Sequence, residues 1–430
     1  MNALSSQPYK GTRDYYPEDK RIQNYIFAVW HKVSKMYGYD EYGAPMLEPL
    51  DVYAAKSGQE IVNEQTYTFT DRGDRVVAIR PEMTPSVSRM VAARRQELAY
   101  PARLYSIANF MRYERPQRGR EREFWQLNVD IFGLDGVVAE AEIIELSDKI
   151  MKEFGALPTD YKIKINSRKL IDFVMTKYFG LDESQSHAMI KLFDRKDKMS
   201  VEEFEVLASE IFGDWAEVGL QKISTLLNAD SIDNLPEEIA NSSSVLEIKD
   251  LFSVLASANV TSCVFDVTLM RGFDYYTGMV FEVFDNHPDN SRALFGGGRY
   301  DGLVGLFGAE PISAVGVAPG GTMMENFLSV HNLTPKLRST TDVYVASLGE
   351  TTSEAGIIAR DLRDKGINVE LDLSGRKLDK QIKTAIKKNV PYMLFVGEEE
   401  VRSGVYSLKD IINSKDFKLD FAGIVDQIKE

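Results

Sequence analysis

The chain has 430 residues, of which 44% are hydrophobic and 27% charged, so it is long enough for two or three domains with buried cores. It contains one cysteine and four scattered histidines, which excludes an internal disulfide and the usual Cys/His zinc clusters. The formal net charge is −14, but residues 201 to 250 hold twelve acidic residues against two lysines and so contribute −10. The rest of the chain is nearly neutral, and a polyanionic partner is therefore not excluded.

The first part of the chain predicts a sheet of antiparallel type with flanking helices. Residues 18 to 37 carry apolar side chains at helical spacing and predict an amphipathic helix that ends at Gly38. Residues 65 to 83 alternate like two strands around an Asp-Arg-Gly-Asp turn. Residues 102 to 113 and 122 to 132 predict another strand pair, joined by an arginine-rich loop and followed by a helix. We therefore expect an α+β domain built on this sheet.

The domain boundaries follow from changes in these patterns. Residues 165 to 260 predict mostly helices, and we interpret this acidic block as an insertion into a catalytic domain of residues 1 to 330, although an ordinary linker domain has the same pattern. Residues 331 to 341 are polar and form the predicted linker. Strands alternate with helices from 342 to 430 and predict a small α/β domain with parallel strand pairs. No run of 18 apolar residues occurs and the first twenty residues are polar, so we expect a cytoplasmic protein without a membrane segment.

The arginine-rich loop is the strongest chemical signal. Five arginines lie within eleven positions, at 112, 115, 118, 120 and 122. Guanidinium groups bind phosphate oxygens bidentately, and an aromatic ring such as Phe124 can stack on a base. The loop therefore suits a nucleotide, although a solvated hairpin tip with Arg–Glu pairs would have a similar sequence.

Two glycine-containing segments follow much later in the chain. The sequence MRGFDYYTG occupies residues 270 to 278, and GGGRYDG occupies residues 296 to 302. Three consecutive glycines weaken a strand and are best explained by a ligand or another backbone lying against them. The paired tyrosines could equally be half-buried strand packing. Neither a P-loop nor a Rossmann fingerprint is present, so any phosphate would be bound by side chains.

In this order, the motifs closely resemble those of the histidyl-tRNA synthetases, a class II aminoacyl-tRNA synthetase family. Residues 110 to 133 are similar to motif 2, the two glycine-containing segments to the histidine-specific signatures, and residues 79 to 89 to the amino-acid-binding segment. Residues 371 to 385 resemble the anticodon-binding domain, although a lysine-rich solvated helix would look alike. The resemblance implies a ligase that converts L-histidine and ATP to histidyl-adenylate and pyrophosphate, and then transfers histidine to the 3′ end of tRNA-His.

The resemblance also implies roles for individual residues. Arg271 and Arg112 would be the catalytic cations at the α-phosphate of ATP. The histidine pocket would contain Glu82, Thr84, Arg112, Gln126, Asp130, Arg271, Tyr275, Tyr276 and Tyr300. The ATP site would contain Arg112, Glu114, Arg120, Phe124 and Arg271. The tRNA would contact Gln117, Arg376, Lys377 and Lys380. A homodimer is implied with Pro45 at its interface, and Mg²⁺ is expected on the pyrophosphate side of ATP without a metal site built by the protein itself.

One position departs from the family pattern. Motif 3 of the family usually ends in Gly-x-Glu-Arg, whose arginine meets the γ-phosphate of ATP, and this chain has Met323 there. Either a neighbouring cation replaces that arginine, or ATP activation is impaired. Two alternatives to the ligase stay open: a regulatory paralogue of the ATP phosphoribosyltransferase type that binds histidine without aminoacylation, and a general ATP-dependent carboxylate-activating enzyme that needs no tRNA.

Overall fold

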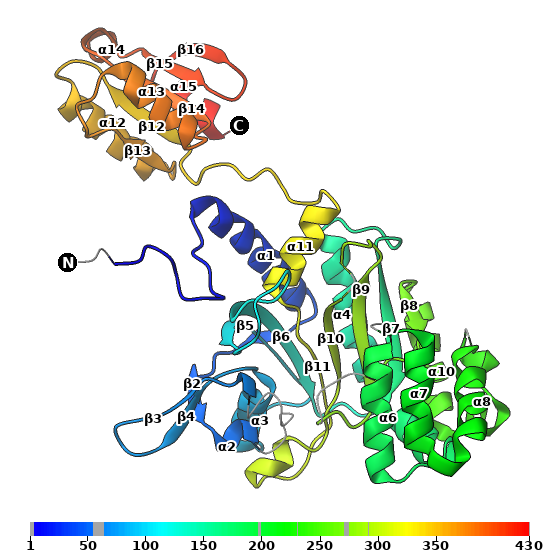
Figure 1. The fold of residues 1–430 in the computed structure, drawn as a ribbon. Coiled ribbons are helices and arrows are strands. Elements are labelled where there is room, and N and C mark those ends of the chain that lie inside the picture. The colour runs from blue at the N-terminus through cyan, green and yellow to red at the C-terminus, as the bar shows by residue number, and fades with distance from the viewer. Residues whose placement is uncertain are drawn as a thin grey trace. The chain divides into compact units, whose positions relative to one another are not determined.

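The computed structural model describes residues 4–54, 64–196, 199–229, 231–270, 275–290 and 292–429. The chain forms two compact units, Met1–Thr334 and Pro335–Glu430, and each is described by itself (Figure 1). Among the described residues, no helix has both the length and the apolar character needed to cross a membrane.

The first unit is built on an eight-stranded mixed sheet with the order β1-β5-β6-β11-β10-β9-β7-β8. Its strands are β1 (Asp40–Glu41), β5 (Ala102–Met111), β6 (Glu123–Phe132), β7 (Tyr161–Ser167), β8 (Cys263–Phe265), β9 (Met279–Asp285), β10 (Ala293–Arg299) and β11 (Ala314–Val317). Five of the seven strand pairs are antiparallel, as expected, but the edge strands β1 and β8 pair in parallel with β5 and β7. These edge strands have two and three residues, which is too short for a pattern that would predict their direction.

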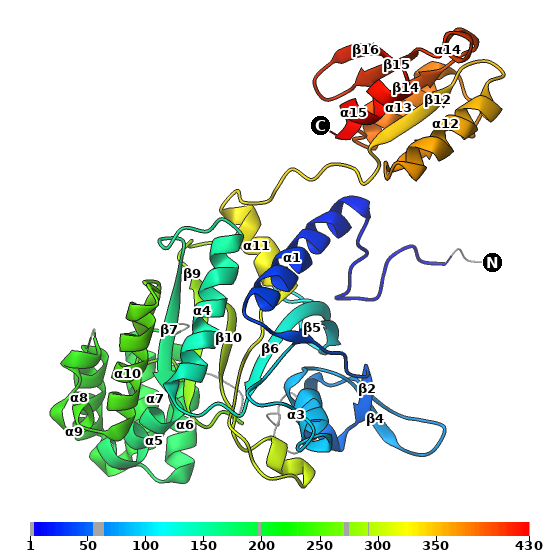
Figure 2. The same cartoon turned by 180° about the vertical axis from the view of Figure 1, so that it is seen from behind.

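Three helices pack on this sheet: α1 (Pro17–Met36), α4 (Val137–Glu153) and α11 (Gly321–Val330). Figure 2 shows them across one face of the sheet. The predicted apolar stripe of α1 is buried, with Trp30 and Val33 fully enclosed in the core that α1 shares with α4 and the sheet. The helix ends at Met36, and Gly38 follows with a φ of +75°, a conformation that glycine adopts without strain.

A smaller sheet and two helices flank the long hairpin β5–β6. Its strands are β2 (Leu47–Pro49), β4 (Val76–Ile79) and β3 (Thr68–Thr70), and the helices are α2 (Asp51–Ala54) and α3 (Thr84–Ala93). The turn between β3 and β4 is closed by Asp71, whose carboxylate accepts hydrogen bonds from the backbone N–H groups of Gly73 and Arg75. This is the turn that the sequence predicted. Strands β5 and β6 pair along ten residues each, so the arginine-rich loop is the tip of a long, regular hairpin.

The acidic helical block lies between β7 and β8. It contains α5 (Arg168–Phe173), η2 (Val174–Tyr178), α6 (Glu183–Arg195), α7 (Val201–Phe212), η4 (Gly213–Trp215), α8 (Ala216–Leu227), η5 (Ile232–Asn234), α9 (Glu237–Ala240) and α10 (Ser243–Ser257). Ser200 caps α7, since its hydroxyl accepts a hydrogen bond from the backbone N–H of Glu203 at 3.1 Å. The apolar faces of these helices continue the core of the main sheet.

The second unit has a five-stranded sheet with the order β13-β12-β14-β15-β16. Its elements are β12 (Val343–Ser347), α12 (Thr352–Asp364), β13 (Val369–Leu371), α13 (Leu378–Lys387), β14 (Tyr392–Val396), α14 (Glu398–Ser403), β15 (Tyr406–Asp410), β16 (Lys415–Leu419) and α15 (Phe421–Lys429). Strand β12 pairs in parallel with β13 and β14, as expected for strands joined by helices. The antiparallel strands β15 and β16, which complete the sheet, were not predicted. In the first unit, the short helix η6 (Val304–Phe307) lies between β10 and β11 in the chain.

Candidate functional site

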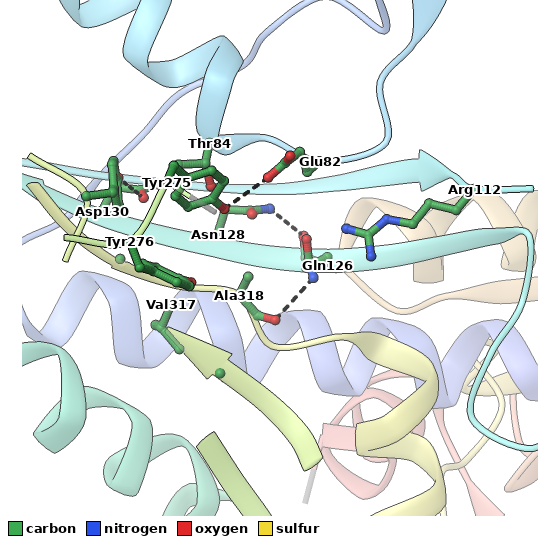
Figure 3. A pocket seen from close by; sticks show the side chains of 13 residues that line it. Glu82, Thr84, Arg112, Gln126, Asn128, Asp130, Tyr275, Tyr276, Val317 and Ala318 are labelled. Atoms are coloured by element: carbon green, nitrogen blue, oxygen red, sulfur yellow. Dashed lines mark hydrogen bonds between the residues drawn. The ribbon is translucent and has the colours of Figure 1, made fainter. Parts of the chain in front are cut away.

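A pocket lies on the main sheet where the start of α3 approaches β6, β10 and β11 (Figure 3). The residues that line it are Glu82, Thr84, Arg112, Gln126, Asn128, Asp130, Tyr275, Tyr276, Gly296, Tyr300, Gly316, Val317 and Ala318. Eight of the nine residues predicted for a histidine pocket are in this set. The ninth, Arg271, lies outside the described residues. The fold thus brings together residues from Glu82 to Ala318, which are more than 200 positions apart in sequence.

Strand β6 supplies one wall of the pocket. Gln126, Asn128 and Asp130 alternate along it and therefore point to the same face of the sheet. The Gln126 side-chain amide donates a hydrogen bond to the carbonyl oxygen of Ala318 at 3.1 Å. Asn128, which is buried, was not among the predicted site residues. The alternation of side chains along a strand could have predicted it, since Asn128 lies between the predicted site residues Gln126 and Asp130.

Asp130 is the buried acid of this wall. Tyr300 donates a hydrogen bond to its Oδ1, whereas Oδ2 has no hydrogen-bond partner within the described part of the chain. Burial raises the pKa of this carboxyl from 3.8 to about 7, and the Tyr300 hydroxyl opposes part of that rise. A buried carboxylate oxygen without a partner is costly unless a ligand donates to it. The pocket therefore suits a ligand with an N–H group at this point.

The opposite wall carries Glu82 and a cluster of tyrosines. Tyr275 donates a hydrogen bond to a carboxylate oxygen of Glu82 at 3.0 Å, and its ring packs on Tyr276 and Tyr300 with centroids 5.0 and 5.9 Å away. Burial, with the Glu82 charge as the next cause, raises the pKa of Tyr275 well above its ordinary value. These phenols are thus neutral hydrogen-bond donors near pH 7. The paired tyrosines therefore do not serve only to pack the strand, because their hydroxyl groups also line the pocket.

The consecutive glycines are explained by backbone that lies against them. A Cβ on Gly297 would lie 2.2 Å from the carbonyl oxygen of Gly316 on β11. A Cβ on Gly298 would lie 2.6 Å from the carbonyl oxygen of Met279 on β9. Gly296 also lines the pocket. The glycines therefore let β10 fit between its neighbours and leave one side of the pocket without side chains.

The arginine-rich loop extends from the other end of the pocket. Arg112 donates from Nε to the carbonyl oxygen of Pro81 at 2.8 Å, and its guanidinium carbon lies 5.3 Å from the centroid of the Phe124 ring. Arg120 forms an ion pair with Glu114 at 3.1 Å. Arg112 thus lines the pocket, and Arg120 forms an Arg–Glu pair of the kind expected at a solvated hairpin tip.

The N-terminal segment packs on the base of this loop, which the sequence did not predict. Arg122 donates from its backbone N–H to the carbonyl oxygen of Gly11 at 2.6 Å and from Nη1 to the hydroxyl of Tyr9 at 3.0 Å. Its guanidinium carbon lies 4.0 Å from the centroid of the Tyr113 ring. Arg122 is therefore engaged in holding the loop to the N-terminal segment.

Arg13, in the same segment, joins the loop to α11. It forms ion pairs with Glu121 of the loop, at 3.3 Å, and with Glu325 of α11. Thr322, at the start of α11, also donates a hydrogen bond to Glu121 at 3.0 Å. The base of the loop is thus fixed to the N-terminal segment on one side and to α11 on the other.

The residues predicted to contact tRNA are on the surface of both units. In the first unit, the Gln117 side chain accepts a hydrogen bond from Arg292 at 2.9 Å. In the second unit, Arg376 donates from Nε to the Ser374 hydroxyl at 2.7 Å and lies 3.5 Å from Asp372. Lys377 and Lys380 are exposed at the start of α13. Their charged groups are accessible to a large anionic partner.

Comparison with known proteins agrees with these motifs. Residues 11–320 match the family model described as histidyl-tRNA synthetase, and residues 342–430 match an anticodon binding domain. The chain belongs to the histidyl-tRNA synthetase family. It is 41% identical to the histidine–tRNA ligase of Leptospira biflexa, over 99% of this chain and 98% of that protein. It is 36% identical to the histidine–tRNA ligase of Haloarcula marismortui, over 94% and 93% of the two chains.

Solved structures of similar proteins have the same fold. The histidyl-tRNA synthetase of Nostoc sp. PCC 7120 superposes with a TM-score of 0.84 at 23% identity and covers 99% of both chains. A Bacillus halodurans protein, titled an ATP phosphoribosyltransferase regulatory subunit/histidyl-tRNA synthetase, has a TM-score of 0.76 at 24% identity, over 92% of this chain and 100% of that one. The predicted family resemblance and fold class are confirmed. The fold alone does not separate the family's ligases from such a protein.

Proposed function

We propose that the chain is a histidine–tRNA ligase. The carboxylate of L-histidine attacks the α-phosphorus of ATP, the bond to the β-phosphate oxygen breaks and pyrophosphate leaves. A ribose hydroxyl at the 3′ end of tRNA-His then attacks the acyl carbon of histidyl-adenylate, and AMP leaves. The observation that carries this proposal is the buried Asp130 carboxylate, whose Oδ2 has no hydrogen-bond partner among the described residues, in a pocket of a chain that belongs to this family.

The pocket offers a complementary group to each part of the amino acid. An imidazole N–H would donate to the Asp130 Oδ2, and the carboxylate of Glu82 would attract the α-ammonium group with Thr84 beside it. Gln126 and the tyrosine hydroxyls would orient the ring and the backbone of the substrate. Such a pocket rejects apolar side chains of similar size, since its buried polar groups would lose their partners.

Arg112 would act where the carboxylate and the α-phosphate meet, and its position in the pocket lining beside Phe124 supports this role. A fixed guanidinium stabilises the negative charge that develops on the phosphorus oxygens, and removing one such group typically costs about 100- to 1000-fold in rate. Arg271 is proposed as the second catalytic cation by family resemblance. Phe124 would stack on the adenine, and Glu114 and Arg120 would lie near the nucleotide.

Mg²⁺ is part of the proposal as an ion that enters with ATP. Within the described part of the chain, no group of three His, Cys, Asp or Glu side chains could hold a metal ion. We expect the magnesium ion to be bound mainly by phosphate oxygens and water, as is usual for Mg²⁺ that binds together with a nucleotide. The ion would neutralise charge on the leaving pyrophosphate.

The tRNA contacts proposed for the second unit rest on the exposed lysines of α13 and the adjoining Arg376 and Lys377. In the first unit, Gln117 at the tip of the arginine-rich loop would meet the acceptor end. Contacts to phosphates make affinity fall steeply with salt. Substitution of Lys380 by alanine is therefore expected to weaken the binding of different tRNA sequences by a similar factor. It should also reduce the salt dependence of that binding.

A homodimer in the cytoplasm completes the proposal. Pro45 is exposed, and four apolar side chains of the small sheet and its approach are about half exposed: Met46, Leu47, Phe69 and Val76, at 45%, 46%, 46% and 50%. Exposed apolar side chains gathered on one small sheet favour a protein interface. Analytical ultracentrifugation of the wild type and of Leu47→Asp tests this, and an unchanged monomer in both would count against it.

One assay series tests the proposed function. Wild-type protein should catalyse histidine-dependent exchange of pyrophosphate into ATP and should charge tRNA-His, and Arg271→Ala should lose exchange. Histidine binding without exchange would favour the regulatory alternative, and exchange without tRNA charging would favour the general carboxylate-activating enzyme. The regulatory alternative is less favoured, since the relatives that are 41% and 36% identical carry the ligase name and residues 342–430 match an anticodon-binding model.

A further inference from the structure

Arg292 is a cation that the proposed function leaves without a role. It directly precedes β10, the strand whose Gly296 lines the pocket. Its Nη2 donates a hydrogen bond to the side-chain oxygen of Gln117, at the tip of the arginine-rich loop, at 2.9 Å. Its Nη1 is buried and has no hydrogen-bond partner within the described part of the chain. A buried guanidinium nitrogen of this kind needs an acceptor, and a ligand oxygen is the simplest one.

The same loop tip meets Met323. Gln117 and Arg120 form a tight turn that contains Gly119, and the sulfur of Met323 lies so close that a Cβ on Gly119 would be 2.3 Å from it. Arg292 and Met323 therefore contact the same four-residue turn, at Gln117 and at Gly119. Because β10 and α11 also contact each other, the two residues belong to one neighbourhood. A guanidinium from Arg292 can thus serve the region where the family carries its motif 3 arginine.

Charge distinguishes Arg292 from other arginines around the loop. Arg13 is paired with Glu121 and Glu325, and Arg120 is paired with Glu114. Arg292 forms no ion pair among the described residues, and the group that it contacts is a neutral amide. Its full positive charge is therefore available to an anion, whereas Arg13 and Arg120 would first have to leave a carboxylate.

We propose that Arg292 binds the terminal phosphates of ATP in this chain and replaces the arginine that Met323 displaces. The proposal rests on the proposed function for the identity of the nucleotide site. Arg292 would then be the cation through which an ATP site with a methionine at position 323 still binds the terminal phosphates. Its Nη1–H would donate to a phosphate oxygen, and the hydrogen bond to Gln117 would hold the guanidinium in place.

Calorimetric titration of full-length wild type and Arg292→Ala with ATP and with AMP tests this. Loss of a charged phosphate partner should weaken ATP binding by about 10- to 100-fold. AMP affinity should stay within twofold, since AMP lacks the terminal phosphates. Arg118→Ala removes an exposed arginine from the same loop and serves as the matched control, with both affinities expected to stay near wild type. Met323→Arg in the Arg292→Ala background should restore ATP affinity, because it returns a guanidinium to the same neighbourhood.

Two results would overturn the proposal: unchanged ATP affinity in Arg292→Ala, or an equal loss of ATP and AMP affinity, which indicates a general collapse of the loop. Pyrophosphate exchange in the wild type separates the two proposals. If exchange occurs but Arg292→Ala binds ATP normally, the ligase stands and the role of Arg292 is lost. If exchange fails but the ATP preference depends on Arg292, the phosphate contact stands and the ligase is lost.

Discussion

Asp130 has a hydroxyl donor on one carboxylate oxygen and none, among the described residues, on the other. Burial disfavours its charge and raises its pKa to about 7, so the acid is poised between its two forms near neutral pH. Its partner Tyr300 comes from a segment 170 residues later in the chain. The raised pKa of Asp130 thus arises from the surroundings of the residue and not from its identity alone.

The isosteric change Asp130→Asn should raise the KM for histidine by about 10- to 100-fold, since a charged hydrogen bond to the imidazole is lost. The KM for ATP should remain within about twofold, because the proposed contact of Asp130 is with the imidazole and not with the nucleotide. Steady-state pyrophosphate exchange with each substrate varied in turn measures both values. An equal rise for both substrates would point to a misfolded pocket instead of a lost contact.

The raised pKa of Asp130 also predicts how stability depends on pH. Between its ordinary pKa of 3.8 and the folded value of about 7, the folded chain binds more protons here than the unfolded chain. This site therefore stabilises the fold most at low pH, and its contribution is lost as pH rises through that window. Asp130→Asn cannot titrate, so its free energy of unfolding should rise relative to wild type by on the order of 2 kcal/mol from pH 5 to pH 8.

Urea unfolding of wild type and Asp130→Asn at both pH values, without histidine, measures this difference. Other titrating groups are the same in the two proteins, so their effects cancel to first order. A difference that is constant with pH would mean that Asp130 titrates in the folded chain as it does in the unfolded one.

At the scale of elements, close backbone packing of β9, β10 and β11 shapes the pocket. The strands approach so closely that Gly297 and Gly316 have no room for a Cβ: one on Gly316 would lie 2.2 Å from Oδ1 of Asp130. The order of the strands in the sheet was not predictable from the sequence, because neighbouring strands such as β6 and β11 are far apart along the chain.

Gly297→Ala should destabilise the first unit by about 1 to 3 kcal/mol, since a methyl group would collide with the backbone of β11. Gly302→Ala is the matched control, because a Cβ at that position meets nothing within 4 Å. Its effect should stay within about 1 kcal/mol. Thermal unfolding followed by circular dichroism compares the two variants, and similar losses in both would contradict the packing argument.

At the scale of the whole molecule, the two units have separate cores. The buried residues of the second unit form their own clusters around β12 and β14, and the linker segment carries few apolar side chains. Such a unit is able to fold by itself. Under the proposed function, amino-acid activation would belong to the first unit and contacts to the anticodon arm of the tRNA to the second.

A chain of residues 1–334 should therefore keep histidine-dependent pyrophosphate exchange within about threefold of the full chain. Its affinity for tRNA-His should fall by at least about tenfold, because the lysines of α13 and their phosphate contacts are gone. Exchange kinetics and filter binding at fixed salt measure the two effects. Loss of exchange in a folded fragment would mean that the second unit contributes to activation.

The sequence by itself determined the family, the main helices and strands, and most of the residues that line the pocket. It could do so because hydrophobic periodicity and short motifs are local properties of the chain. Only the tertiary structure decided which groups meet: Tyr275 with Glu82 across 193 positions, Tyr300 with Asp130, and Arg292 with Gln117. These contacts depend on strand order and register, which arise from packing between distant segments. The same packing buries Asp130, and its pKa and its open oxygen are therefore consequences of the fold.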